Sequence, residues 1–237
     1  MKGETGAKKY AILFAILFLP TILYLLFVYG KGEQNFAHLP FVTYTDAMGE
    51  EQNRKAPEFG FINQDSVPFT SKDLKGKIYV VDFFFTSCPS ICPIMTANMG
   101  KLQKRFSSFE EFELVSFTVD PERDTPERLR EYAEQRMINT DKWNLITGAQ
   151  DSLYSVAYHY LSSAMEDSLA AGGFLHTEYF VLIDKEGNLR SRDDEHGNVI
   201  GVYDGTSAQH IRDLIDDIKV LIAEYNLELK KNKKEDE

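Results

Sequence analysis

The sequence predicts an α/β protein in which a mixed β-sheet is flanked by helices, preceded by one N-terminal transmembrane helix. Apolar runs typical of buried strands alternate with segments of helical periodicity, which indicates β–α units. Hairpin patterns at both ends of that series make the sheet mixed rather than fully parallel. An uncharged segment, Tyr10–Tyr29, precedes all of these elements.

Tyr10–Tyr29 is long enough to cross a bilayer as a helix, since at 1.5 Å per residue it spans roughly 30 Å. Three lysines and one glutamate precede it, and the positive-inside rule therefore predicts a cytoplasmic N-terminus and an exported C-terminal part. A cleaved signal peptide is the alternative, but residues 29–32 lack a small-x-small cleavage site. No cysteine lies nearby to carry a lipid.

Composition limits the partners of the exported part. The chain has 237 residues and a formal net charge of −11, which disfavours binding to nucleic acid or to an anionic membrane surface. The exported length suffices for one core domain. We predict these segments along the chain: a cytoplasmic N-terminus (1–9), an anchor (10–29), a polar spacer (30–56), one domain (57–229) and a charged tail (230–237).

The domain begins with a hairpin and a buried strand. Residues 57–65 read as a strand that enters a turn, and residues 67–70 return alongside it. The apolar run Ile78–Phe85 does not alternate, which is typical of a strand buried on both faces. A turn and then a helix to about Ser107 follow, with apolar residues at helical spacing.

Two further β–α units come next. Phe112–Val119 is a strand, and the helix after it has Pro126 in its first turn with Asp124 or Thr125 as its cap. The second unit comprises a short strand over 143–147 and a helix over 151–161.

The last third of the domain is expected to contain a loop (162–173), a hairpin (178–183 with 189–192) and a long helix (207–229). This order of elements suits a thioredoxin-like fold. In open α/β sheets ligands gather at the carboxyl ends of the strands, where Cys88 and Asp120 would lie. His176 would reach that edge from the loop before residue 178.

The only two cysteines of the chain, Cys88 and Cys92, lie at the break after strand 78–85. If the segment from Pro89 onward is helical, both sulfurs lie on one face and Cys88 lies at the helix N-terminus, which favours its thiolate. A disulfide closing so small a loop removes little chain entropy, so a reactive pair is favoured over a structural one. Such a pair can act as a redox dithiol or bind a soft metal ion.

A metal ion would need further ligands. Zinc would require four, and a second cysteine pair is absent, whereas two sulfurs and one imidazole suit a three-coordinate Cu(I). Among five histidines we favour His176, which follows Gly172–Gly173 and immediately precedes a buried strand. The others lie in the spacer (His38), on helices (His159, His210) and in an acidic turn (His196).

Four other side chains near the cysteines could take part in the chemistry: two methionines as thioether ligands of a metal, and two aspartates. Met95 and Met99 continue the cysteine stripe, but methionines at helical spacing are typical of a core. Asp120 and Asp124 could act on a thiol proton or face a basic partner, while a helix cap is the simpler role for Asp124.

Three motifs in order resemble the Sco/SenC family of cytochrome c oxidase assembly proteins. They are Phe-Thr-Ser-Cys-Pro-Ser-Ile-Cys-Pro over residues 85–93, Asp-Pro-Glu-Arg-Asp-Thr-Pro over 120–126, and His176 before a strand. The resemblance extends from about Pro57 to Glu224. Ser87 stands where many members have histidine, and the stretch 190–204 is longer than usual.

The resemblance implies a membrane-anchored thioredoxin-like domain that binds copper through Cys88, Cys92 and His176. Such proteins help to load the dinuclear copper centre of oxidase subunit II, as copper donor, thiol reductant or both. Whether Cu(II) binds as well as Cu(I) stays open.

We therefore expect a metallochaperone in a bacterial inner membrane, crossing it once, with its domain in the periplasm. A mitochondrial location is disfavoured because no Arg-rich, acid-poor segment precedes the span. The main alternative is an enzyme, a periplasmic thiol–disulfide oxidoreductase that acts on a partner's cysteines without metal. A peroxidase and a redox or copper sensor are further alternatives.

Overall fold

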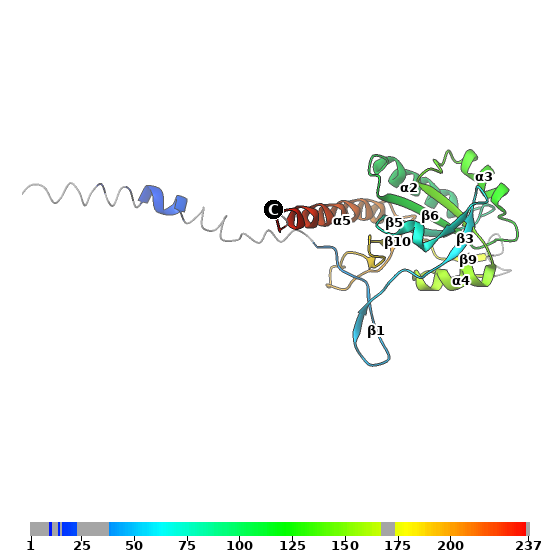
Figure 1. Ribbon diagram of the computed structural model, residues 1–237, viewed down its shortest axis with the longest axis horizontal. Coiled ribbons are helices and arrows are strands. Elements are labelled where there is room, and N and C mark those ends of the chain that lie inside the picture. Colours follow the sequence, from blue (N-terminus) through cyan, green and yellow to red (C-terminus); the bar gives the residue numbers. More distant parts are fainter. Residues whose placement is uncertain (1–9, 11–13, 15, 23–37, 167–173, 236–237) are drawn as a thin grey trace, which may run out of the picture. The chain divides into compact units, whose positions relative to one another are not determined.

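The structure is a computed structural model that describes residues 10, 14, 16–22, 38–166 and 174–235 (Figure 1). The chain divides into two compact units, residues 1–38 and 39–237, and the elements below belong to the second. Most of the predicted anchor, the Gly172–Gly173 segment and both chain ends lie outside the described residues. Within the described residues, no helix combines the length and the apolar character that crossing a membrane requires.

An eight-stranded mixed sheet forms the centre of the described domain. Its strands lie in the order β4 (Pro68–Thr70), β3 (Gly60–Asn63), β7 (Trp143–Thr147), β6 (Phe112–Thr118), β5 (Ile78–Phe84), β10 (Tyr179–Ile183) and β11 (Leu189–Arg190), with β12 (Tyr203–Asp204) also paired to β10. β5, β6 and β7 are parallel, and the hairpin strands join them antiparallel. Every residue of β5 and β6 is buried, as their non-alternating apolar runs predict.

Helices cover both faces of this sheet (Figure 1). α2 (Cys92–Arg105) and α3 (Pro126–Gln135) share one face, where the hydroxyls of Thr96 and Tyr132 lie 2.8 Å apart. α4 (Gln150–His159) covers the other, and Tyr160 after it contacts Tyr79 on β5. The turn before α5 (Ala208–Glu235) contacts α2, since the amide of Asn98 donates to the carbonyl of Gly205 at 2.6 Å. The predicted thioredoxin-like fold is confirmed.

Two predicted boundaries differ from the structure. The segment predicted as a loop (162–173) contains β8 (Ala164–Glu166), which pairs with β9 (Phe174–His176) just after it; both three-residue strands are too short for a periodic signal. The last helix ends at Glu235 rather than Leu229, because its Lys- and Glu-rich end consists of good helix formers. The 3₁₀ turn η1 (Ser71–Leu74) precedes β5.

Part of the predicted spacer packs on the domain, and part of it projects as a hairpin. β1 (Thr43–Thr45) and β2 (Glu51–Asn53) form an exposed hairpin that projects from the body (Figure 1). Leu39 and Val42, just before it, are buried in the core. The sequence concealed this attachment because the contacting residues are few and lie in a polar context.

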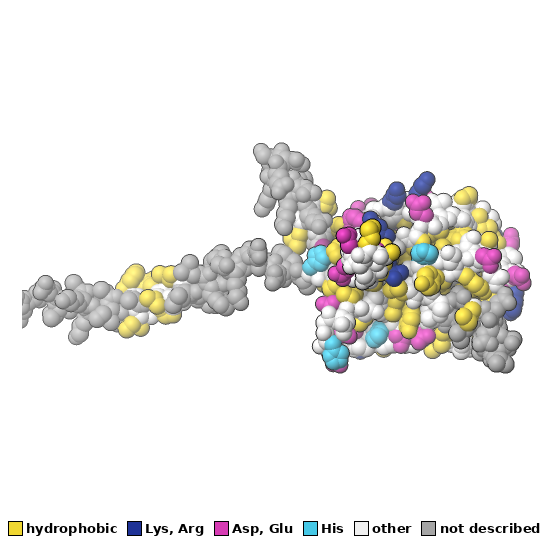
Figure 2. All heavy atoms as spheres, turned by 90° about the horizontal axis from the view of Figure 1, so that it is seen from below, with side chains coloured by type: hydrophobic (Ala, Val, Ile, Leu, Met, Phe, Trp, Pro, Cys, Tyr) yellow, Lys and Arg dark blue, Asp and Glu magenta, His cyan; other side chains and the backbone are white. Residues whose placement is uncertain are grey.

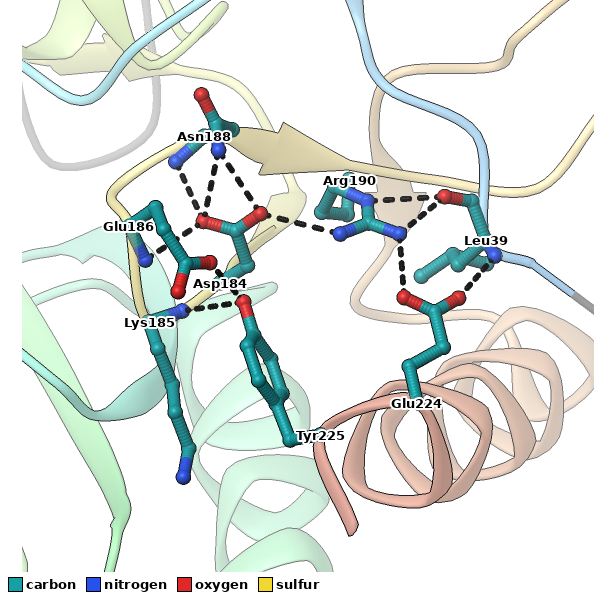
Figure 3. A network of polar contacts seen from close by, with 8 residues as sticks. All are labelled: Leu39, Asp184, Lys185, Glu186, Asn188, Arg190, Glu224 and Tyr225. Atoms are coloured by element: carbon teal, nitrogen blue, oxygen red, sulfur yellow. Dashed lines mark hydrogen bonds and ion pairs between the residues drawn. The ribbon is translucent and has the colours of Figure 1, made fainter. Parts of the chain in front are cut away.

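Arg190 attaches this segment to the domain (Figure 3). Its buried guanidinium donates from Nε to the carbonyl of Leu39 at 2.9 Å and pairs with the carboxylates of Asp184 (3.1 Å) and Glu224 (2.7 Å). The amide of Leu39 donates to the second oxygen of Glu224 at 2.5 Å. The ring of Phe41 lies 4.2 Å from the guanidinium carbon. We call these five residues the Arg190 cluster.

Candidate functional site

The cysteine turn lies at the carboxyl end of β5, in the middle of the sheet. The amide of Cys88 donates to the carbonyl of Phe85 at 3.2 Å, and α2 begins at Cys92. A helix from Pro89, which is the condition for placing both sulfurs on one helix face, is therefore not formed. A helix from Pro89 would place Pro93 beyond the first turn, where its missing N–H would remove a backbone hydrogen bond.

The two thiols are adjacent, reduced and buried. Cys88 is 8% exposed and Cys92 is 1% exposed. The pKa of the Cys92 thiol is raised, chiefly by a hydrogen bond with the sulfur of Cys88 and secondly by burial. A backbone hydrogen bond with Phe85 lowers this pKa by a smaller amount. Cys92, at the start of α2, is therefore a thiol at neutral pH, and a metal ion that binds its sulfur must displace a proton.

Asp124 holds the cysteine turn. Its fully buried carboxylate accepts hydrogen bonds from the amide of Thr86 (3.0 Å), the hydroxyl of Thr86 (2.5 Å) and the hydroxyl of Thr118 (2.5 Å). Thr125, not Asp124, caps α3 by accepting from the amide of Arg128 at 3.4 Å. Asp124 thus ties the turn after β5 to the end of β6.

The loop after β6 also contacts β9. Asp120 is buried, and its Oδ2 lies 3.2 Å from Nε of Arg123. Burial raises the pKa of Asp120, and the charge of Arg123 opposes that rise. The guanidinium of Arg123 lies 5.6 Å from the ring centroid of Phe174 on β9, and the Phe174 ring lies 5.4 Å from that of Phe85.

His176 is the last residue of β9, opposite Ala164. It lies in a strand rather than in the predicted loop, two positions after Phe174. The imidazole of His176 lies outside the described part of the structure. Among the side chains that are described, no group of three or more His, Cys, Asp or Glu residues is placed to hold a metal ion.

The remaining candidates have local roles. Met95 and Met99 are fully buried in the core, in keeping with the core interpretation. Nδ1 of His159 lies 2.8 Å from the carbonyl of Ser155. His210 and His196 are also engaged locally: Nδ1 of His210 accepts from the amide of Asp204, and exposed His196 lies beside Glu195.

Sequence reasoning missed Phe174 and the role of Thr86. Phe174 lies two positions before His176, a same-face spacing that carries meaning only once β9 is known to be a strand. Thr86 lies inside the cysteine motif, but its partner Asp124 is 38 residues away and no local pattern connects them.

Residues 47–209 match the SCO1/SenC family. The "SCO1 protein homolog" of Bacillus subtilis is 30% identical over 169 residues, which cover 70% of this chain and 82% of that protein.

Solved structures with the same fold carry related names. A SCO1/SenC family lipoprotein from Bacillus anthracis str. Ames is 37% identical, with a TM-score of 0.62 over 72% of this chain and 96% of that one. BsSco, a Sco family cytochrome c oxidase assembly protein with a disulfide switch, is 29% identical, with a TM-score of 0.60 over 71% and 94%. Arabidopsis thaliana ScoI with copper bound is 25% identical, with a TM-score of 0.57 over 72% and 99%.

Proposed function

The chain belongs to the SCO1/SenC family, and from that premise we propose that it is a copper chaperone and thiol-redox factor. It binds copper through Cys88, Cys92 and His176 and assists assembly of the dinuclear copper centre of cytochrome c oxidase subunit II. The observation that carries this proposal is the pair of adjacent, reduced thiols at the carboxyl end of β5. Copper is the cargo of the protein rather than a resident cofactor.

The donor set suits Cu(I). Thiolate sulfur is a soft ligand that favours this ion, and imidazole is compatible with it. Cu(I) would replace the thiol protons of Cys88 and Cys92, so only the reduced pair can bind. A coordination number of three leaves room for an acceptor thiolate to join the copper before a donor ligand leaves. Because only the reduced pair binds copper, the oxidation state of Cys88 and Cys92 would control copper transfer.

The third ligand is supported by the position of β9. Phe174 packs on Phe85 at the cysteine turn. Because alternate positions of a strand share one face, positions 174 and 176 lie on the same face of β9. That register supports His176 over the four other histidines.

The membrane arrangement is part of the proposal. We propose one span over residues 10–29, a cytoplasmic N-terminus (1–9), and a periplasmic domain over residues 57–229 that presents the cysteines to its partner, with a charged tail beyond. The residues on either side of the exposed hairpin pack on that domain: Leu39 and Val42 are buried, and Phe41 and Lys55 form bridges to Arg190 and Asn188. The basis is the charge distribution around the uncharged segment.

A Cu(I) titration tests the ligand assignment. The reduced full-length chain is titrated against a competing chelator, alongside Cys88→Ser, Cys92→Ser and His176→Ala. We expect one tightly held equivalent in the parent chain and much weaker binding in all three variants. His159→Ala, which removes an exposed helical histidine, serves as the matched control and should bind normally. Full affinity in Cys88→Ser and His176→Ala would remove these residues as ligands.

A second candidate function is thiol–disulfide exchange on a partner's cysteines without metal. It is favoured by the disulfide switch of the related BsSco and by the presence of both thiols within hydrogen-bonding contact. Its test is turnover of a dithiol substrate by metal-free protein. Rapid turnover that His176→Ala does not change would support the oxidoreductase, whereas turnover no faster than that of Cys88→Ser would exclude it.

A further inference from the structure

A stack of three side chains joins β9 to the loop after β6 and to the cysteine turn. Phe174 lies between the ring of Phe85, at 5.4 Å, and the guanidinium of Arg123, at 5.6 Å. Phe85 and Phe174 are buried, whereas the side chain of Arg123 is 60% exposed. The stack therefore begins in the core and ends at solvent.

Phe85 connects the stack to both cysteines. Its carbonyl accepts from the amide of Cys88 at 3.2 Å, and its backbone also makes a hydrogen bond with Cys92. The same residue thus contacts the cysteines through its backbone and β9 through its ring. A change in the position of the Phe174 ring against Phe85 would therefore alter the distance between β9 and the two sulfurs.

Residues 120–124 hold the other end. Arg123 pairs with the buried carboxylate of Asp120 at 3.2 Å. One residue further on, Asp124 binds the amide and the hydroxyl of Thr86 in the cysteine turn. The loop after β6 therefore contacts two segments: Asp124 binds the cysteine turn, and Arg123 contacts Phe174 on β9.

We propose that Phe174 and Arg123 are positioning residues that hold β9, and with it His176, against the cysteine turn. The inference rests on the proposed function, in which position 176 supplies the third copper ligand. A cation–ring contact at an exposed site is weak, which allows β9 to withdraw. Once an acceptor thiolate has bound the copper, the bond from His176 would break as β9 withdraws.

A double-mutant cycle tests the inference. Phe174→Leu and Arg123→Gln are each made in the full-length parent chain and in His176→Ala, and Cu(I) affinity is measured by chelator competition. Each substitution should weaken binding about tenfold in the parent, the usual size for residues that orient a ligand. In His176→Ala each should weaken binding less than about twofold, because no imidazole is left to position.

Two control variants separate positioning from folding. Phe106→Leu removes another buried ring, which stacks on Phe112 at 4.9 Å, and Arg54→Gln removes another cation–ring contact, with Tyr44 at 5.4 Å. Urea unfolding should show similar stability losses for Phe174→Leu and Phe106→Leu. Phe174→Leu should also weaken copper binding, whereas the controls Phe106→Leu and Arg54→Gln should leave copper affinity unchanged.

Suppose that His176→Ala alone weakens binding, so that the proposed function stands. The inference is then overturned if Phe174→Leu and Arg123→Gln weaken binding equally in the parent and in His176→Ala, or if they weaken it in neither. If His176→Ala alone leaves affinity unchanged, the three-ligand site fails and the inference fails with it.

Discussion

Asp124 is a buried carboxylate with three hydrogen bonds from two threonines, and it holds the cysteine turn against β6. Such charge-assisted bonds are stronger than neutral ones, and a buried partner left unpaired carries its full desolvation cost. Arg128 on α3 adds a further long-range contact, since its Nε donates to the hydroxyl of Thr86 at 3.3 Å. The shape of the cysteine turn therefore depends on a residue 36 positions after Cys88.

Asp124→Asn should lower the free energy of unfolding by about 1–3 kcal/mol, because an amide offers one acceptor oxygen where the carboxylate offers two. Urea unfolding of the metal-free protein measures this. Asp46→Asn is the matched control: Asp46 also accepts from backbone amides but lies partly open to solvent in the projecting hairpin, and it should change stability little. Equal stability of Asp124→Asn and the parent would show that the turn keeps its shape without the carboxylate.

At the scale of elements, the Arg190 cluster attaches the segment before β1 to β11 and α5 (Figure 3). The cluster contains a buried cation with two carboxylates. Removing one partner of a buried ion pair leaves the others without compensation.

Arg190→Met should therefore cost about 3–5 kcal/mol in the free energy of unfolding. It should also speed hydrogen exchange at the amide of Leu39, which donates to Glu224. Lys219→Met, which breaks an exposed pair with Asp216, should change stability by at most about 1 kcal/mol. Protection of Leu39 equal to that of the parent would show that Val42 and the core hold the segment without Arg190.

Elements with a strong local signal could be predicted from the sequence. Ile78–Phe84 and Phe112–Thr118 are non-alternating apolar runs, and α3 has both a Thr cap and an N-terminal proline. β8 and β9 have no such signal, since three-residue strands are defined by their pairing to each other. The start of α2 at Cys92 could not be located from the sequence, because two prolines, Pro89 and Pro93, each fit a first turn.

The same distinction applies to the candidate site. Cys88 and Cys92 are apparent from the sequence because no other cysteines exist, and the 120–126 motif is apparent from its residue types. The bonds that join these segments are not. Asp124 to Thr86 and Phe174 to Phe85 connect residues 38 and 89 positions apart, and only the folded sheet brings them together.

At the scale of the whole molecule, charge is spread rather than concentrated. The chain carries a formal charge of −11, and on the face shown in Figure 2 lysine and arginine side chains lie in small scattered groups. Apolar and acidic side chains lie between them. Charge of this distribution favours solubility over attraction to polyanions.

Buried tyrosines make the folded state sensitive to alkali. Burial raises the pKa of Tyr132 to about 12, and it also raises the pKa values of three other buried tyrosines, Tyr79, Tyr160 and Tyr203, and of half-buried Tyr225. In the unfolded chain these phenols lose their protons near pH 10. The stability that their neutral forms contribute is fully present below about pH 10 and is lost as the pH rises toward the folded pKa values.

The free energy of unfolding of the parent should fall as the pH rises from 10 to 12. In Tyr132→Phe, the fall between pH 9 and pH 12 should be smaller by roughly 2 kcal/mol, because the variant lacks this phenol. Loss of the hydrogen bond with Thr96 would lower its stability equally at every pH. Urea unfolding at a series of pH values measures both effects. Parallel curves for the variant and the parent would show that Tyr132 ionises alike in the folded and unfolded states.

The most direct test of the central claim is the X-ray absorption spectrum of the reduced full-length chain loaded with one equivalent of Cu(I). We predict two sulfur ligands and one imidazole nitrogen. The nitrogen should disappear in His176→Ala, and one sulfur should disappear in Cys92→Ser. A site with sulfur ligands alone, or an imidazole signal that persists in His176→Ala, would contradict the assignment of copper to Cys88, Cys92 and His176.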